Sequence, residues 1–344
     1  MKYPVIYGGL ALLLIYLVLL SLASGAINVP IESLLNILDS YFTGKQISQD
    51  EIFLKDILVE IRIPRIIFCT VIGGVLGITG TAIQGIFRNP LAEPGLIGIS
   101  AGASFFAALA IVFESFLVSF LGDALNMYLI SIAAFIGACI AVIMVYQISV
   151  FNGKPSIATM ILAGIAINAL AGAATGLMSY MASEQQLRNI TFWSLGSMAG
   201  ATWKSAQVLL IFASVAVVPL LFFGKSLNLF SLGESQAEMM GLNVKKLKLI
   251  IIICSALAVG ASVAFAGVIA FVGLLVPHSL RLIGSVDNRF LLPSSLIGGA
   301  IVINFSDLVA RVVIQPLELP IGVITALIGA PVFLLILIRE KKKL

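Results

Sequence analysis

The chain has 344 residues, of which 60% are hydrophobic and 10% are charged, and its mean hydropathy is +1.14. Soluble domains carry about 25% charged residues, so this composition excludes a water-soluble enzyme and indicates a protein embedded in membrane lipid. The net charge of +4 does not indicate a nucleic-acid partner, because the basic residues stand at the ends of apolar runs and form no patch.

Long apolar runs, taken in chain order, predict an all-α polytopic membrane protein with about ten transmembrane helices. The run at 5–24 has no convincing small-residue cleavage site after it, so we interpret it as a retained first helix. The run at 249–280 exceeds one crossing, and Gly273 and Pro277 divide it. The predicted spans are 5–24, 63–86, 95–113, 126–147, 157–181, 204–223, 248–270, 273–284, 293–313 and 320–338.

Lysine and arginine set the predicted orientation of these spans. Ten crossings put both termini on one side, and that side carries 13 of the 20 basic residues but only 5 of the 16 acidic residues. Because basic loops stay in the cytoplasm, we predict that both termini are cytoplasmic. The 13 basic residues are Lys2, Arg88, Lys154, Lys225, Lys245, Lys246, Lys248, Arg281, Arg289, Arg339, Lys341, Lys342 and Lys343.

Three segments between the spans are too polar to cross. Residues 31–61 are predicted to form an external segment with some amphipathic helix, and 184–203 a short external helix. Residues 225–247 form a long cytoplasmic loop in which Ser231 and Glu234 match a capping box and Gly241 stops a short helix. Exposed apolar residues there, Met239, Met240 and Leu242, would suit docking to a soluble protein; the alternative is a plain connector. The whole chain, 1–344, is one transmembrane domain.

The sequence does not match the usual signatures of catalytic or metal-binding sites. Gly224-Lys225-Ser226 resembles the end of a phosphate-binding loop, but Pro219 stands where its first glycine belongs. His278 is the only histidine, which leaves no zinc pair and no Ser-His-Asp set. The cysteines Cys69, Cys139 and Cys254 are isolated in apolar runs and are interpreted as small hydrophobic residues. We therefore expect no catalytic residue, no metal and no cofactor.

Three arginines stand at the predicted outer boundary of the membrane. Arg62 and Arg65 share a helix face, and Arg311 ends the ninth span. Guanidinium groups suit the capture of carboxylates on an external partner. Two alternatives stay open: the arginines anchor helix ends in lipid headgroups, or Arg311 pairs with Asp307 one turn away.

Five motifs, in order from about residue 60 to the C-terminus, closely resemble the FecCD-type permeases. These are the membrane subunits of bacterial type II ABC importers for iron-siderophores, haem and cobalamin. The motifs are RIPR at 62–65, GTAIQGIFRNPLAEPGLIGISAGA at 80–103, GESQAEMMGL at 233–242, GVIAFVGLLVPHSLRLIG at 267–284 and SDLVARVVIQPLELPIGVITALIGAPVFLLIL at 306–337.

The resemblance implies a type II ABC importer permease fold in the bacterial cytoplasmic (inner) membrane. It further implies a homodimer around a central pathway, a cytoplasmic ATPase dimer that hydrolyses ATP, and a periplasmic or lipid-anchored substrate-binding protein. By this resemblance, Arg62, Arg65 and Arg311 meet acids of the binding protein. The ATPase would meet the coupling residues of 233–243, namely Gly233, Glu234, Ala237, Met240, Gly241 and Leu242.

The resemblance also implies a cytoplasmic gate and a lined pathway. The gate positions are Asn89 and Leu91, with Ile157 and Ala158 before the fifth helix. That last pair departs from the cobalamin permease, whose counterpart is small and hydroxylated. The fifth and tenth helices are the expected lining, and the lining residues assigned on this basis are Met160, Asn168, Met178 and Met181.

The substrate ranked first is haem, followed by a ferric siderophore and then cobalamin. LRNITFWSLGSMAGATW at 187–203 looks most like haem-type permeases. Four methionines lie between Met160 and Met198, with no fixed charge between Lys154 and Glu184, which suits a flat apolar macrocycle. Methionines also fill gaps in helix packing, and this alternative stays open.

Two other classes of function are weighed against an importer. An ion-coupled secondary transporter usually carries ionisable groups in mid-span, and here only Asp307 approaches that depth. A structural or assembly protein of the membrane is a third reading. The match of 233–242 to a coupling motif argues for the ATP-driven importer.

Overall fold

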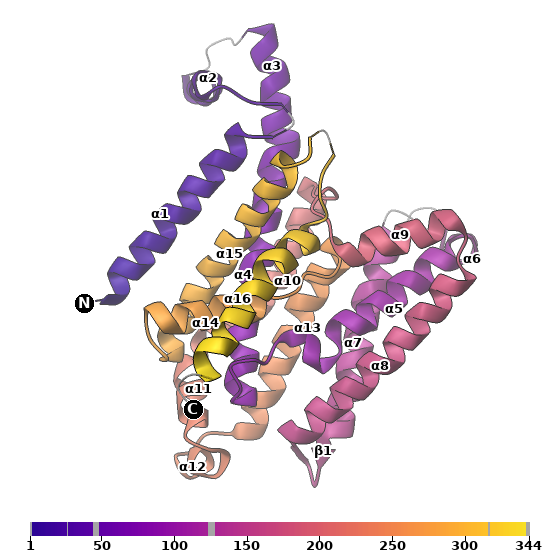
Figure 1. Cartoon of the computed structure of the whole chain (residues 1–344), viewed down its shortest axis with the longest axis vertical. Coiled ribbons are helices and arrows are strands. Elements are labelled where there is room, and N and C mark those ends of the chain that lie inside the picture. Colours follow the sequence, from indigo (N-terminus) through magenta and orange to yellow (C-terminus); the bar gives the residue numbers. More distant parts are fainter. Residues whose placement is uncertain (1, 26, 44–47, 123–127, 316, 342–344) are drawn as a thin grey trace.

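The computed structural model describes residues 2–25, 27–43, 48–122, 128–315 and 317–341. Within these ranges the chain is almost entirely helical, which confirms the predicted all-α class (Figure 1). One hairpin, β1 (Val150–Phe151) with β2 (Lys154–Pro155), is the only sheet in the described residues. Residues 44–47 of the predicted external segment, the start of the predicted fourth span at 126–127, and the last basic residues at 342–343 lie outside the described ranges.

The helices follow one another with short connections. In chain order they are α1 (Lys2–Ala23), α2 (Ile31–Thr43), α3 (Gln49–Asp56), the π-helical turn η1 (Ile57–Arg62), α4 (Ile63–Phe87), the 3₁₀ turn η2 (Pro94–Ile97), α5 (Ile99–Val112), α6 (Glu114–Leu121), α7 (Leu129–Ser149), α8 (Ile157–Met181), α9 (Glu184–Leu195), α10 (Trp203–Phe222), α11 (Gly224–Ser231), α12 (Glu234–Met239), α13 (Val244–Ala266), α14 (Val272–Ile283), α15 (Asn288–Val312) and α16 (Ile321–Lys341).

Each predicted span corresponds to an apolar helix, although the helices differ in length. In the described part of the chain, seven helices are long and apolar enough to cross a membrane, and the bent pair of α5 and α6 makes an eighth. The apolar part of α16, Ile321–Leu335, and α14 are shorter. The predicted count of about ten is therefore approximate, and the seven or eight longer helices alone establish a multi-pass protein.

The third predicted span, 95–113, differs most from its structure. Its first residues form η2, and α5 has only 14 residues, about 21 Å at 1.5 Å per residue. The axis then bends by 80° into α6. The bend coincides with Glu114, whose charge would be costly in hydrocarbon, so the chain turns aside where this residue begins α6.

Helices α4 and α15 form the centre of the molecule and pack along each other (Figure 1). Glycine makes this contact possible, as a Cβ on Gly73 would lie 2.2 Å from the carbonyl oxygen of Gly299. A Cβ on Gly77 would lie 2.0 Å from the oxygen of Ser295. Small residues thus allow these two helix backbones to approach closely, as is common in lipid.

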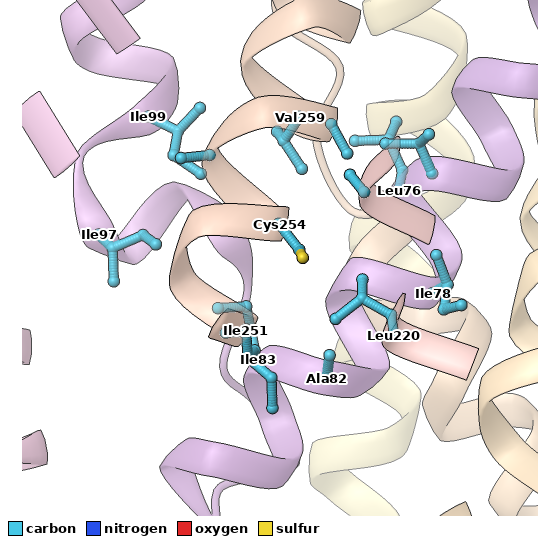
Figure 2. Close-up of a cluster of buried hydrophobic side chains, with 14 of the residues drawn as sticks. Leu76, Ile78, Ala82, Ile83, Ile97, Ile99, Leu220, Ile251, Cys254 and Val259 are labelled. Carbon is cyan, nitrogen blue, oxygen red and sulfur yellow. The ribbon is translucent and has the colours of Figure 1, made fainter. Parts of the chain in front are cut away.

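One large apolar cluster joins the halves of the molecule through α13. Figure 2 shows Leu76 and Ile83 of α4 in the same cluster as Ile251 and Val259 of α13 and Leu220 of α10. Helices α5, α7 and α8 pack together on the far side of α13 from α4 (Figure 1). Cys69 and Cys254 are buried in the bundle and Cys139 is half-buried, each with a free thiol.

The two ends of the bundle carry different extramembrane elements. The segment 31–61 forms α2, α3 and η1 beyond the end of α4, and a capping box of Ser48 with Glu51 starts α3. In Figure 1 these helices lie at the top, whereas α12 and the β1–β2 hairpin lie at the bottom. The predicted external segment and the predicted coupling loop are therefore at opposite ends.

Candidate docking sites and transport pathway

The three predicted docking arginines are buried and meet in one group with two acids, which we call the arginine cluster: Arg62, Arg65, Arg311, Asp307 and Glu318. The arginines are 5%, 9% and 7% exposed, respectively. Arg65 joins the start of α4 to Asp307 of α15 at 2.8 Å and to Glu318, before α16, at 2.8 Å. The sequence separation of these residues explains why only Asp307–Arg311, one helical turn apart, could be anticipated, and that pair is present at 3.0 Å.

The other contacts of the arginine cluster bind the end of α1. Arg62 donates to the carbonyl oxygens of Leu22 and Ile27. Arg311 donates to the hydroxyl of Ser21 and, at 3.2 Å, to the carbonyl of Ser24. In the isolated chain these guanidinium groups therefore bind the chain's own acceptors, and docking to a partner stays a prediction.

The loop at 225–247 folds into α11 and α12. Gly241 follows α12 in a left-handed conformation (φ +85°), which confirms the predicted stop. The predicted capping box is wrong, because the N-cap is Gly233 and the Ser231 hydroxyl donates to the Asn228 carbonyl instead. The carboxylate of Glu234 turns to Lys248 at 2.8 Å, and this ion pair outweighs a cap because the lysine is fully buried.

The surface of α12 matches the predicted docking face in part. Met239 and Met240 are 84% and 58% exposed, while Leu242 is half-buried and Ala237 is buried in the core. Lys154 of the β1–β2 hairpin pairs with Glu238 of α12 at 3.0 Å. The hairpin therefore braces a short helix whose exposed side is apolar.

The predicted gate residues lie in two connections. Asn89 and Leu91 follow α4, and the Asn89 side chain accepts a hydrogen bond from the Leu91 amide at 2.9 Å. Asn89 also borders a cavity of about 290 Å³ beside α11. Ile157 and Ala158 form the first turn of α8, directly after the hairpin. Their role as a gate stays a prediction.

The predicted lining residues differ in exposure: some are buried within the chain and others are on its surface. Met160 and Met178 are buried, at 1% and 9% exposure, and Met198 is buried at 2%, so all three pack inside the chain's own bundle. Met181 is 55% exposed, beside Tyr180 at 88%. The gap-filling alternative thus describes the first three methionines in this structure.

Asn168, the fourth predicted lining residue, borders a cavity of about 280 Å³ between α4, η2, α8 and the connection from α13 to α14. Its amide nitrogen donates to the Gly95 carbonyl at 3.2 Å, and its buried side-chain oxygen has no donor in the described residues. Glu93 lines the same cavity, and burial raises the pKa of its carboxyl.

Glu93 was missed by sequence analysis, which treated the wall as free of charge because it considered α8 alone. The signal available was one acid within the otherwise uncharged stretch after Asn89-Pro90. The opposite wall contains Phe271 at a left-handed φ of +70°, which is uncommon for a bulky residue. A Cβ on Gly329 of α16 would lie 2.5 Å from the Phe271 Cβ, so the cavity lies near both α8 and α16.

These features define a class: a multi-pass helical membrane protein with a cavity among its helices, lined by polar and apolar side chains, and with apolar side chains exposed on its outer surface. The chain belongs to the FecCD transport family, whose model matches residues 13–339. This membership confirms the resemblance inferred from the motifs.

The relatives of this chain are transport proteins. The chain is 39% identical over 341 residues to the hemin transport system permease protein HmuU of Yersinia pestis, covering 97% of this chain and 96% of that protein. It is 39% identical over 287 residues to the cobalamin import system permease protein BtuC of Halobacterium salinarum, covering 83% and 74%. The chain is therefore a transport permease of the FecCD family, and the cargoes in the names of these two relatives are hemin and cobalamin.

A solved structure supports the same assignment. It shows a metal-chelate type ABC transporter in an inward-facing conformation and matches with a TM-score of 0.81 and 29% sequence identity. The match covers 98% of this chain and 99% of the other. The fold of the importer permease is thus confirmed along nearly the whole length.

Proposed function

We propose that this permease imports haem from the external side of the bacterial cytoplasmic membrane by alternating access. The observation that carries this choice is the exposed face of α8, which is apolar and contains no charged residue from end to end. The relative with the widest coverage reported above transports hemin. The large exposed side chains of this face are Leu162, Ile165, Leu170, Leu177, Tyr180 and Met181.

An apolar face without a strong ligand suits the release of an iron macrocycle. A histidine or thiolate on the wall would bind the iron and retain the cargo. His278 is buried in α14, and no side chain of α8 is a histidine or cysteine. The wall would therefore contact haem by dispersion and burial of apolar area, which are weak enough per contact to allow passage.

Cobalamin is the second candidate, and the cavity beside Asn168 favours it. The buried Asn168 amide oxygen has no donor in the described residues, and the half-buried Glu93 carboxyl lines the same cavity. The peripheral amides of cobalamin could supply donors, whereas the propionates of haem could not. A ferric siderophore is the remaining alternative within the family.

The substrate can be decided with a reconstituted importer in vesicles. We expect ATP hydrolysis to rise when haem-loaded binding protein is added and to stay at the basal rate with siderophore-loaded or cobalamin-loaded protein. Stimulation by either of the other ligands, without stimulation by haem, would replace haem by that ligand and leave the permease assignment intact.

The proposed assembly places each partner at one end of the bundle. A second copy of the chain completes the pathway, and the ATPase dimer binds α12 on the cytoplasmic side, together with Gly233, Glu234, Ala237, Met240, Gly241 and Leu242. A periplasmic or lipid-anchored binding protein docks over the arginine cluster and α9. Both termini are then cytoplasmic, and ATP is hydrolysed by the separate subunit.

The gate of this proposal closes near the cytoplasmic ends of α4 and α8. Asn89 and Leu91 from one connection and Ile157 and Ala158 from the other would meet their counterparts across the dimer axis. The ion-coupled secondary transporter is a weaker alternative, because Asp307, the one acid that approaches mid-span, accepts hydrogen bonds from arginines with both of its carboxylate oxygens. It is therefore not free to carry a coupling ion.

A further inference from the structure

The Arg65 guanidinium is occupied by two of the chain's own carboxylates in this structure. Its Nε and Nη2 donate to Asp307 Oδ1 at 3.0 and 2.8 Å, and its Nη1 and Nη2 donate to the two oxygens of Glu318 at 2.8 and 2.9 Å. Four of the five donors of the guanidinium are therefore used. An external acid could bind this group only if one of the two carboxylates left.

We propose that Glu318 is an internal stand-in for the binding protein's carboxylate and is displaced from Arg65 when that protein docks. This inference rests on the proposed function, because it assumes that the arginine cluster faces a substrate-binding protein. It adds a residue that competes with the partner and thereby sets the affinity of docking.

Glu318, rather than Asp307, is the carboxylate that can leave. The Asp307 side chain is 2% exposed and is shared between Arg65 and Arg311, so its release would strand two buried charges. The Glu318 side chain is 42% exposed, and within the described ranges Arg65 is its one ion-pair and hydrogen-bond partner. A partner's carboxylate arriving from solvent could form the same bidentate hydrogen bonds to Arg65 while the Glu318 side chain turns outward into water.

The charge of the arginine cluster also favours an added acid. Ion pairs among the described residues supply two carboxylates to three guanidinium groups, and Arg62 is held by neutral carbonyl oxygens only. The cluster therefore keeps one uncompensated positive charge. An arriving carboxylate would be attracted before Glu318 has left, which makes an exchange of partners easier than a prior opening.

Release of Glu318 would loosen the connection into α16. The described residues of this connection are otherwise joined to the rest of the chain by these hydrogen bonds: Gln315 to the Gly25 carbonyl at 3.2 Å, Leu319 to Ala310 at 3.1 Å, and Ile321 to Gly196 at 3.1 Å. Gly196 in turn abuts the carbonyls of Ala266 and Val268, next to the Asn168 cavity. A displacement of Glu318 on docking would therefore reach the wall of the proposed pathway through the connection before α16 and its contact with Gly196.

The test measures the affinity of the permease in lipid nanodiscs for the purified substrate-binding protein from the same gene cluster. We expect Glu318→Gln to tighten binding by about tenfold, because the variant removes the competing charge and leaves the side chain's shape nearly unchanged. The matched control is Glu60→Gln, which removes an exposed acid of η1 that has no ion pair in the described chain. We expect this control to change the affinity by less than about twofold.

A double-mutant cycle assigns the effect to Arg65. In an Arg65→Gln background, Glu318→Gln should no longer tighten binding, because the guanidinium for which the two carboxylates compete is absent. The fold of each variant is checked by its thermal unfolding and by its elution as a single species.

Three results would overturn the proposal. Unchanged or weaker binding by Glu318→Gln would show that the two acids do not compete, while the proposed importer function would stand. An equal gain from Glu60→Gln would show a general field effect and no exchange. Failure of the wild-type chain to bind the protein would overturn both the exchange and the proposed docking partner.

Discussion

Glu93 shows how a single residue acquires a distinct chemistry from its surroundings. It lies in the connection between α4 and η2, lines the cavity beside Asn168, and has no ion pair in the described residues. Burial favours the neutral form of a carboxyl, so the pKa of Glu93 is raised above its ordinary value of 4.5. A neutral carboxyl can both donate and accept a hydrogen bond, which an ionised one cannot.

The first prediction concerns the stability of a Glu93→Gln variant as the pH changes. The folded chain keeps the Glu93 proton over a pH range in which the unfolded chain has released it, so this group lowers the free energy of unfolding as the pH rises from 4.5 through the raised pKa. The amide does not titrate. We therefore expect Glu93→Gln to unfold at a higher temperature than the wild type at neutral pH.

Thermal unfolding in detergent at neutral and acidic pH checks this expectation. The advantage of the variant should shrink as the pH falls toward 4.5 and vanish below it. Glu60→Gln, which removes an exposed acid of η1, is measured in parallel as the control. A variant that is less stable than the wild type at neutral pH would indicate that the Glu93 carboxylate is ionised and bound in the folded chain.

At the scale of elements, the contact of α4 with α15 depends on glycine at the crossing. A Cβ on Gly299 would lie 1.9 Å from the Gly73 carbonyl oxygen, so Gly299→Ala must push the two helices apart. Overpacking of this kind costs about 1–3 kcal/mol of stability. Gly172→Ala on α8 is the matched control, since nothing lies within 4 Å of its Cβ position.

Thermal unfolding of the two alanine variants separates packing from helix propensity. We expect Gly299→Ala to lower the melting temperature and Gly172→Ala to leave it unchanged or raise it, because alanine favours a helix over glycine by up to about 1 kcal/mol. Equal melting temperatures for Gly299→Ala and the wild type would mean that α15 can shift past α4 without loss of contact.

The second element-scale prediction concerns α12 as the ATPase contact. Met239→Glu with Met240→Glu places two charges on the exposed apolar side of this helix, where an interface core would exclude them. We expect the ATPase subunit to be lost from the purified complex while the permease stays folded. Leu317→Glu, at the opposite end and 70% exposed, is the control and should retain the ATPase. Retention by the double variant would remove the assignment of α12.

At the scale of the whole molecule, the exposed apolar side chains of a single subunit include some that face lipid and some that face the transport pathway. Exposure in the single subunit does not separate the two groups. Leu12 on α1 is 70% exposed and Leu170 on α8 is 64% exposed. In the proposed dimer, α1 faces lipid, and α8 faces a pathway that water can enter. The same apolar side chain would then be in contact with two different solvents.

Cysteine labelling tests this arrangement in vesicles. In a variant with Cys69, Cys139 and Cys254 replaced by alanine, a membrane-impermeant thiol reagent should label Leu170→Cys in at least one state of the transport cycle. It should not label Leu12→Cys, which is held in hydrocarbon. Equal labelling of the two positions would contradict the assignment of α8 to the pathway.

Structural features that depend on residues close together in the sequence could be predicted from the sequence alone. Apolar runs longer than about 20 residues must become helices in lipid, which determined the all-α class and most span positions. Asp307 and Arg311 are one turn apart, so their pairing depends on helix geometry alone. Gly241 stops α12 because few other residues adopt its positive φ.

Features that join distant segments were decided only by the tertiary structure. Arg65 and Glu318 are 253 residues apart, and Glu93 reaches the cavity beside Asn168 only because η2 packs on α8. The capping prediction at Ser231 failed because α11 extends through Ser231 and α12 begins only after Gly233, where Glu234 pairs with Lys248. Helical periodicity shows which face of a span is apolar but not which neighbour covers it, since lipid, a second subunit and the protein core all accept the same side chains.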